Sequence, residues 1–143
     1  MPNGHPTYLV DTSVWIEGLR PGGSPAIRSL LKPLIAGGQV ALTEWILLEL
    51  MTGLRSKEGK ESLLLWFVPI LRLAFEARWW EDAWEHAAQL RKNGVSPTAA
   101  DCFIATVAIK HGVALIHCDA DFEAMKPIIP LRTIDWTRDR ARR

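Results

Sequence analysis

Acidic side chains at the ends of predicted strands are the first candidates for chemistry in this sequence. Asp11 directly follows the apolar, β-prone run Tyr8–Val10, and Asp119 follows the apolar run Val113–Ile116 after two intervening residues. Ligands of parallel α/β sheets bind at the carboxyl ends of strands, so these two carboxylates are expected to face one crevice. A turn or capping role is the alternative for each aspartate taken alone.

Two more acids lie inside apolar segments that are predicted to be helical. Asp101 is in the first turn of a segment, Ala99–Ile109, that is apolar on nearly every side and is typical of a buried helix. Glu49 interrupts an apolar run in the middle of another predicted helix. Burial of an unpaired carboxylate is costly. The alternatives are a capping partnership of Asp101 with Thr98, and an exposed edge or an ion pair with Arg55 for Glu49.

One common cause explains all of these acids better than separate structural roles. Two carboxylates about 4 Å apart repel by roughly 4 kcal/mol at an effective dielectric near 20, so a cluster needs a counter-charge. Few lysines or arginines lie close to these acids in sequence. A divalent cation with oxygen ligands supplies the charge, and carboxylate sites suit Mg²⁺ or Mn²⁺. Such ions neutralise phosphoryl oxygens and activate water, which predicts chemistry on a phosphate.

Short apolar strands that alternate with helices predict the scaffold for these acids. Such a pattern favours an α/β fold with a buried parallel sheet and helices on both faces. The strands are expected at Tyr8–Val10, Gln39–Leu42, Leu71–Phe75, Val113–Ile116 and Leu131–Ile134. The helices are expected at Pro25–Ala36, Glu44–Thr52, Lys60–Phe67, Ala77–Lys92 and from Ser96-Pro97-Thr98 to Lys110.

Length and composition predict one globular domain over residues 1–143. With 48% hydrophobic and 23% charged residues, the chain is not a disordered one. The longest uncharged apolar run, Ser62–Leu71, is too short to span a membrane, and residues 1–6 lack the pattern of a signal peptide. Two cysteines are too few for a disulfide scaffold and fit a reducing cytoplasm, so we expect a cytoplasmic protein without a membrane partner.

The charge is unevenly distributed although the net charge is only +1. Residues 131–143 carry five arginines against two aspartates, which predicts a basic C-terminal tail at about 136–143. This tail is either an arm that adds salt-dependent affinity for a nucleic acid or a frayed terminus. A polyanion must therefore bind at a local patch rather than through bulk charge.

Four motifs, taken in order, resemble those of the PIN-domain family. They are Asp11-Thr12-Ser13 after a strand, Glu49-Leu50-x-x-Gly53, Asp101-x-x-Ile104-Ala105 and Asp119-x-Asp121-Phe122. Each motif alone is weak, and the four in order are strong. Their spacing and the chain length are most similar to the VapC-type toxins of bacterial and archaeal toxin–antitoxin operons. The resemblance covers about Tyr8 to Ile134.

The resemblance implies a fold, an activity and partners. The implied fold is a three-layer α/β/α sandwich with a short, mainly parallel sheet. The implied activity is that of an endoribonuclease that depends on Mg²⁺, with Mn²⁺ as a substitute, and leaves 5′-phosphate and 3′-hydroxyl ends. Its implied partners are an RNA substrate, a second copy in a homodimer and a cognate antitoxin that blocks the crevice.

The resemblance also assigns roles to the acids and to their neighbours. Asp11 and Asp101 are implied to be direct metal ligands. Glu49 and Asp119 are implied to complete the catalytic cluster, directly or through bound waters. Ser13 is implied to offer its hydroxyl to the metal shell or to the scissile phosphate.

Several further positions have two open interpretations. Asp121 is either a second-shell member of the site or a turn former. The family usually has Thr or Ser two residues before its last acid, and this chain has His117 there, which either contacts substrate or packs. Arg20, like Arg28 and Lys32, is either a phosphate contact or a solvated surface charge.

The seven tryptophans are open to two uses. Three of them, Trp79, Trp80 and Trp84, lie on one predicted helix. Tryptophans can stack on unpaired RNA bases, but on a helix they more commonly pack in the interior or line an interface with a partner.

Other functions remain as alternatives at this stage. One is a PIN nuclease that processes RNA without an antitoxin, and another is a non-catalytic binding module on the same scaffold. A phosphotransfer receiver or a phosphatase on a similar sheet is a third, but such a phosphatase needs Asp-x-Asp after the first strand, where Ser13 stands.

Overall fold

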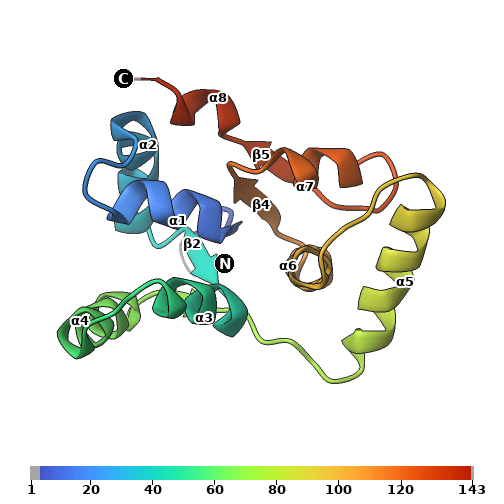
Figure 1. Ribbon diagram of the computed structural model, residues 1–143, viewed down its shortest axis with the longest axis horizontal. Helices are drawn as coiled ribbons and strands as arrows, with labels where there is room; N and C mark the ends of the chain where they lie inside the picture. Colours follow the sequence, from blue (N-terminus) through green and yellow to red (C-terminus); the bar gives the residue numbers. More distant parts are fainter. Residues whose placement is uncertain (1–3, 143) are drawn as a thin grey trace.

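A five-stranded parallel sheet forms the centre of the protein, of which the computed structural model describes residues 4–142 (Figure 1). The strand order is β3-β2-β1-β4-β5, and every neighbouring pair is parallel. The strands are β1 (Tyr8–Val10), β2 (Val40–Leu42), β3 (Leu71–Arg72), β4 (Ala114–His117) and β5 (Thr133–Asp135). The α/β fold with a short parallel sheet between helices, expected from the sequence, is confirmed.

Helices connect the strands, and most of the longer ones begin at a polar cap. They are α1 (Thr12–Leu19), α2 (Pro25–Ala36), α3 (Glu44–Thr52), α4 (Lys57–Phe67), α5 (Trp79–Lys92), α6 (Ala99–His111), α7 (Ala120–Met125) and α8 (Thr137–Arg140). Side-chain oxygens cap the first backbone amides of α1, α2, α3, α4, α6 and α7, which satisfies donors that a helix start leaves unpaired.

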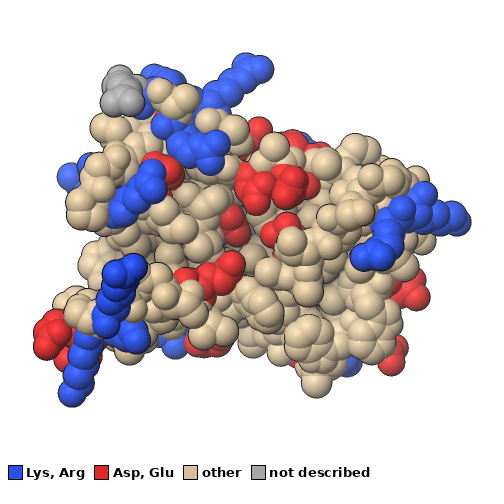
Figure 2. Space-filling view, in the orientation of Figure 1, with Lys and Arg blue, Asp and Glu red and all other residues tan. Residues whose placement is uncertain are grey.

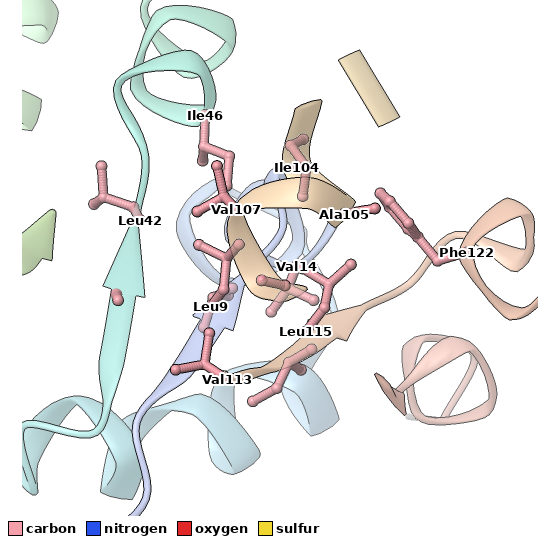
Figure 3. Close-up of a cluster of buried hydrophobic side chains, with 14 of the residues drawn as sticks. Leu9, Val14, Leu42, Ile46, Ile104, Ala105, Val107, Val113, Leu115 and Phe122 are labelled. Atoms are coloured by element: carbon pink, nitrogen blue, oxygen red, sulfur yellow. The ribbon is translucent and has the colours of Figure 1, made fainter. Parts of the chain in front are cut away.

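The core lies between the strands and the helices that cross them. Figure 3 shows Ile46 of α3 and Val107 of α6 beside Leu9 of β1, and Val14 of α1 beside Leu115 of β4. All five side chains are completely shielded from solvent. Because β1 and β4 are covered in this way, their carboxyl ends, and the acids that follow them, are held in fixed positions.

Several element boundaries differ from the sequence-based expectation. The helices α1, α7 and α8 were not expected, and β3 ends at Arg72 rather than at Phe75. Short helices such as α7 and α8 carry too little hydrophobic periodicity to be recognised. At the edge of the sheet, β3 pairs only with β2, so its pairing ends after Arg72.

The basic C-terminal segment packs against the body of the protein as far as it is described. Trp136 is buried, and α8 contacts α2, where the Ser24 hydroxyl donates to the carbonyl of Asp139 at 3.4 Å. Arg143, which belongs to the expected tail, lies outside the described residues. Among the described residues, no helix is long and apolar enough to cross a membrane.

Candidate active site

The strand order places a crevice between the carboxyl ends of β1 and β4. The chain moves from β1 outward to β2 and β3 on one side, and from β4 to β5 on the other. Ligands of open α/β sheets bind at such a switch point. Asp11 follows β1 and Asp119 follows β4, and the Asp11 amide donates to the carbonyl of Ile116 at 2.9 Å. Two of the predicted site residues therefore lie at this edge.

Ser13 fixes the carboxylate of Asp11 and joins the two strand ends. Asp11 is only 6% exposed, and its Oδ2 accepts from the Ser13 amide at 3.1 Å and from the Ser13 hydroxyl at 2.6 Å. The same hydroxyl accepts from the Cys118 amide at 3.0 Å. Burial raises the pKa of Asp11, the Ser13 hydrogen bonds oppose this, and the charge of Asp119 adds to the rise.

Three aspartates from two helix starts come together beside Asp11. One carboxylate oxygen each of Asp101, Asp119 and Asp121 lies within 4.8 Å of the others. Asp119 caps α7, and its Oδ1 accepts from the Asp121 amide at 3.0 Å. Burial raises the pKa of Asp101 to about 6, and the charges of Asp119, Asp11 and Asp121 contribute to the rise.

Glu49 extends the acidic cluster from α3. Its carboxylate is half-buried and accepts from the Thr12 hydroxyl at 2.9 Å, so it belongs to the same face as Asp11. Burial raises the pKa of Glu49, and the charge of Asp11 adds to this effect. Figure 2 shows acidic side chains along a hollow at the centre of one face of the molecule. The structure thus brings together Glu49, Asp11 and the aspartate trio.

The donor set fits a divalent cation. A hard ion such as Mg²⁺ holds oxygens at about 2.1 Å, so opposite ligands lie about 4.2 Å apart. Adjacent ligands of the same octahedral ion lie about 3.0 Å apart. The oxygens of the trio, within 4.8 Å of one another, reach these spacings by closing in around the ion. Among residues 4–142, no Lys or Arg forms an ion pair with any acid of the cluster. A bound cation would relieve the repulsion between the carboxylates.

His117 packs beneath the site and has no surface from which to touch substrate. Its side chain is completely buried, and its Nδ1 accepts from the Asp119 amide at 3.1 Å. The proton of the neutral ring therefore lies on Nε2, which donates to Glu123 Oε1 at 2.9 Å. Of the two interpretations left open by the sequence, the structure has the packed histidine, which also orients the backbone of Asp119.

Arg20 lies beside the acidic cluster. Together with Glu49, Trp15 and Leu50 it lines a hollow of about 400 Å³, and it forms an ion pair with Glu17 at 2.9 Å. Arg28 of α2 donates to the backbone carbonyls of Gly18 and Arg20, at the end of α1. Of the three basic residues considered from the sequence, Arg20 is thus next to a cluster acid, and Lys32 lines a different hollow along α2.

The tryptophans of α5 divide between the interior and the surface. Trp79 is buried, whereas Trp80 and Trp84 are exposed. Trp80 contacts Phe75 and Phe103, so part of this surface is an aromatic cluster that continues into the core.

Sequence patterns assign no role to two residues that support the site. Thr12 donates to Glu49, and Glu123 accepts from His117, and no local pattern indicates contacts that form only when separate elements pack. Asp121, a candidate from the motif Asp119-x-Asp121, has a carboxylate oxygen within 4.8 Å of those of Asp101 and Asp119.

Comparisons with known proteins agree with this geometry. A family model described as PIN domain matches residues 8–126. Ribonuclease VapC11 of Mycobacterium tuberculosis (strain ATCC 25618 / H37Rv) is 32% identical over 133 residues, which are 90% of this chain and 98% of that protein. Ribonuclease VapC21 of the same strain is 31% identical over 132 residues, 90% of this chain and 92% of that protein.

Solved structures share the fold. VapBC2 from Rickettsia felis, bound to a DNA fragment from its promoter, matches with a TM-score of 0.75 and 21% identity over 91% of this chain and 98% of that one. DNA-bound VapBC from Salmonella typhimurium matches with a TM-score of 0.71 and 19% identity, over 92% and 99%. At these identities the structural likeness shows the fold.

The parallel sheet, the acidic cluster and the matching family model together define the class of this protein: the chain belongs to the PIN-domain family. Within that family it is a VapC-type ribonuclease, as its relatives VapC11 and VapC21 are.

Proposed function

We propose that the acidic cluster is the catalytic centre and that it works with Mg²⁺, for which Mn²⁺ can substitute. The observation that carries the proposal is the trio Asp101, Asp119 and Asp121, with oxygens within 4.8 Å, beside the buried Asp11. Asp11, Asp101 and Asp119 would hold the ion, and Asp121 would complete its shell. A bound divalent ion supplies positive charge for the phosphoryl oxygens and lowers the pKa of water.

The surrounding residues prepare the acids for this role. The Ser13 hydroxyl donates to Asp11 and accepts from the Cys118 amide. Because both of these hydrogen bonds are made within the protein, Ser13 positions the Asp11 carboxylate and does not contact the phosphate. Glu49, held by Thr12, has a raised pKa and is suited to accept the proton of an attacking water at its carboxylate. The cluster repels RNA when no cation is bound, so the ion should strengthen RNA binding and is required for cleavage.

The partners follow from the family. The solved relatives are VapBC toxin–antitoxin complexes, which supports a cognate antitoxin for this chain and makes it the toxin of such a pair. A homodimer is what the family resemblance implies. Exposed apolar side chains on two elements, Trp80 and Trp84 of α5 and Leu65 of α4, are the candidates for these contacts. We place the protein in the cytoplasm, and the free thiols of Cys102 and Cys118 support this.

Cleavage of total cellular RNA tests the catalytic proposal. The purified protein is incubated with Mg²⁺, Mn²⁺ or EDTA, beside the variants Asp11→Asn and Asp101→Asn. We expect each variant to lose about 100-fold or more in rate, and EDTA to abolish cleavage. Glu81→Gln, at an exposed acid in the first turn of α5, is the matched control and should cut normally. Equal cleavage by all variants, or cleavage in EDTA, would refute the proposal.

A further inference from the structure

A hollow of about 600 Å³ lies between the loop after α1 and the segment around α8. We call it the arginine hollow, and its lining residues are Glu17, Arg20, Gly22, Gly23, Ser24, Pro25, Arg140, Ala141 and Arg142. Its arginines come from opposite ends of the chain and meet because α8 packs on α2. In Figure 2, basic side chains gather over α1, α2 and α8, beside the acidic centre.

The acids that pair with the arginines of the hollow, Glu17 in its lining and Asp139 on α8, are less exposed than the arginines. The side chain of Glu17 is 13% exposed and accepts from the Ser24 amide at 3.0 Å as well as from Arg20, whose side chain is 55% exposed. The side chain of Asp139 is 24% exposed and pairs with Arg142, which is 72% exposed. Each guanidinium has five N–H donors, so one ion pair leaves donors that point to solvent.

Arg140 adds positive charge that no acid of the hollow neutralises. Its Nη1 donates to the carbonyl of Cys118 at 2.9 Å, and among residues 4–142 no ion pair involves it. Cys118 directly precedes Asp119, and its amide donates to Ser13. The hydrogen bond from Arg140 therefore fixes the arginine hollow against the strand end that carries the acidic cluster.

We propose that the arginine hollow binds a backbone phosphate of single-stranded RNA next to the bond that is cut, with Arg20 and Arg142 as the donors. This inference rests on the proposed function, because the acidic cluster fixes where the scissile phosphate lies. An RNA strand that enters an acidic crevice needs compensating cations beside it, and the guanidinium group matches the oxygens of a phosphate. The body of the chain offers no bulk positive charge, so a local site must supply it.

Binding of a fluorescein-labelled single-stranded RNA of mixed sequence tests the proposal. The titration is run in EDTA, so that no cleavage occurs, over a series of salt concentrations. We compare the wild-type chain with the double variant Arg20→Gln, Arg142→Gln. The expected result is a loss of affinity of about tenfold and a salt slope that is lower by about 0.7 for each phosphate contact removed. The double variant Arg91→Gln, Lys92→Gln, at the far end of α5, carries the same loss of charge and should change neither quantity.

The outcomes separate this proposal from the catalytic one. If both double variants weaken RNA binding equally, the proposal that the arginine hollow binds RNA is overturned, whether or not the protein cleaves RNA. If the arginine variant leaves RNA binding unchanged but weakens association with an acidic partner protein, the hollow is a protein-binding site and the proposal is also overturned. If the wild-type chain binds RNA through the arginines and yet never cleaves it with Mg²⁺, the arginine hollow stands as a phosphate site for RNA, and the catalytic proposal fails together with the position next to a cut bond.

Discussion

At the scale of single residues, the site is held by side chains that are not themselves acids. Ser13 joins the end of β1 to the end of β4, and His117 holds the backbone of Asp119. Both act through hydrogen bonds that they make in a buried setting, where an unsatisfied partner costs about 1–3 kcal/mol. The geometry of the acidic cluster is therefore sensitive to changes in these neutral supports.

Removal of the Ser13 hydroxyl should weaken metal binding. In Ser13→Ala, Asp11 loses its 2.6 Å hydrogen bond and the Cys118 amide loses its acceptor. The pKa of Asp11 then rises further, and we expect Mn²⁺ affinity to fall by about tenfold, measured by isothermal titration calorimetry. Ser62→Ala, at an exposed position of α4, is the control. Unchanged affinity in Ser13→Ala would show that Asp11 does not need this anchor.

Truncation of His117 should destabilise the fold and disturb Asp119 together. His117→Ala leaves a cavity and removes the acceptor of the Asp119 amide, so we expect the free energy of unfolding to fall by about 3 kcal/mol in urea titrations. Glu123→Gln keeps the volume and the contact with Nε2 and should cost clearly less. Equal losses in both variants would assign the effect to the negative charge of Glu123 rather than to the buried ring of His117.

The sequence predicts the acids of the site better than it predicts their supports. Asp11, Glu49, Asp101 and Asp119 stand out because a carboxylate in an apolar setting needs an explanation. The role of His117 depends on Glu123 and on the backbone of Asp119, which meet it only after the strand and α7 have packed. No local pattern reports such a contact.

At the scale of elements, the caps place the functional groups. Asp11 and Asp119 are both cluster acids and helix caps, so the capping role holds for each of them and is compatible with the metal-binding role proposed for the same carboxylates. The strands and long helices follow from apolar runs and cap residues. The helix α1 was missed because its first residues form the first acidic motif, and their helical period covers only two turns.

Loss of the Thr98 cap should weaken α6 and raise the pKa of Asp101. The Thr98 hydroxyl accepts from the Asp101 amide at 3.1 Å, and its hydrogen bond lowers the pKa of the Asp101 carboxyl. We expect Thr98→Ala to lower the free energy of unfolding by about 1 kcal/mol. Thr98→Ser keeps the cap and should retain most of the stability in the same urea titration. A Thr98→Ala protein as stable as wild type would contradict this role.

At the scale of the whole molecule, the acidic cluster lowers the free energy of unfolding of the metal-free protein at neutral pH. Burial raises the pKa values of Asp11, Glu49 and Asp101, which means that folding favours their protonated forms. Protonation of such a carboxyl group stabilises the folded state. This stabilisation is complete below the pKa that the group has in the unfolded chain, and it is lost as the pH rises through the pKa that the group has in the folded chain. The metal-free protein should therefore lose stability between about pH 4 and about pH 7.

Thermal unfolding in EDTA across this range measures the effect. The pKa of Asp101 moves from 3.8 to about 6, and after allowance for solvent screening we expect a loss of about 1–2 kcal/mol from this residue. Asp101→Asn cannot ionise, so its melting temperature should fall less over the same range. Glu123 and Asp135 have lowered pKa values, so their ionisation stabilises the fold. That contribution is lost only as the pH falls to more acidic values. Added Mn²⁺ should stabilise the wild-type chain more at about pH 7 than at about pH 5, because the ion binds the deprotonated carboxylates. If Asp101→Asn follows the same pH profile as wild type, Asp101 is not part of a crowded acidic centre, and the site loses one of its expected metal ligands.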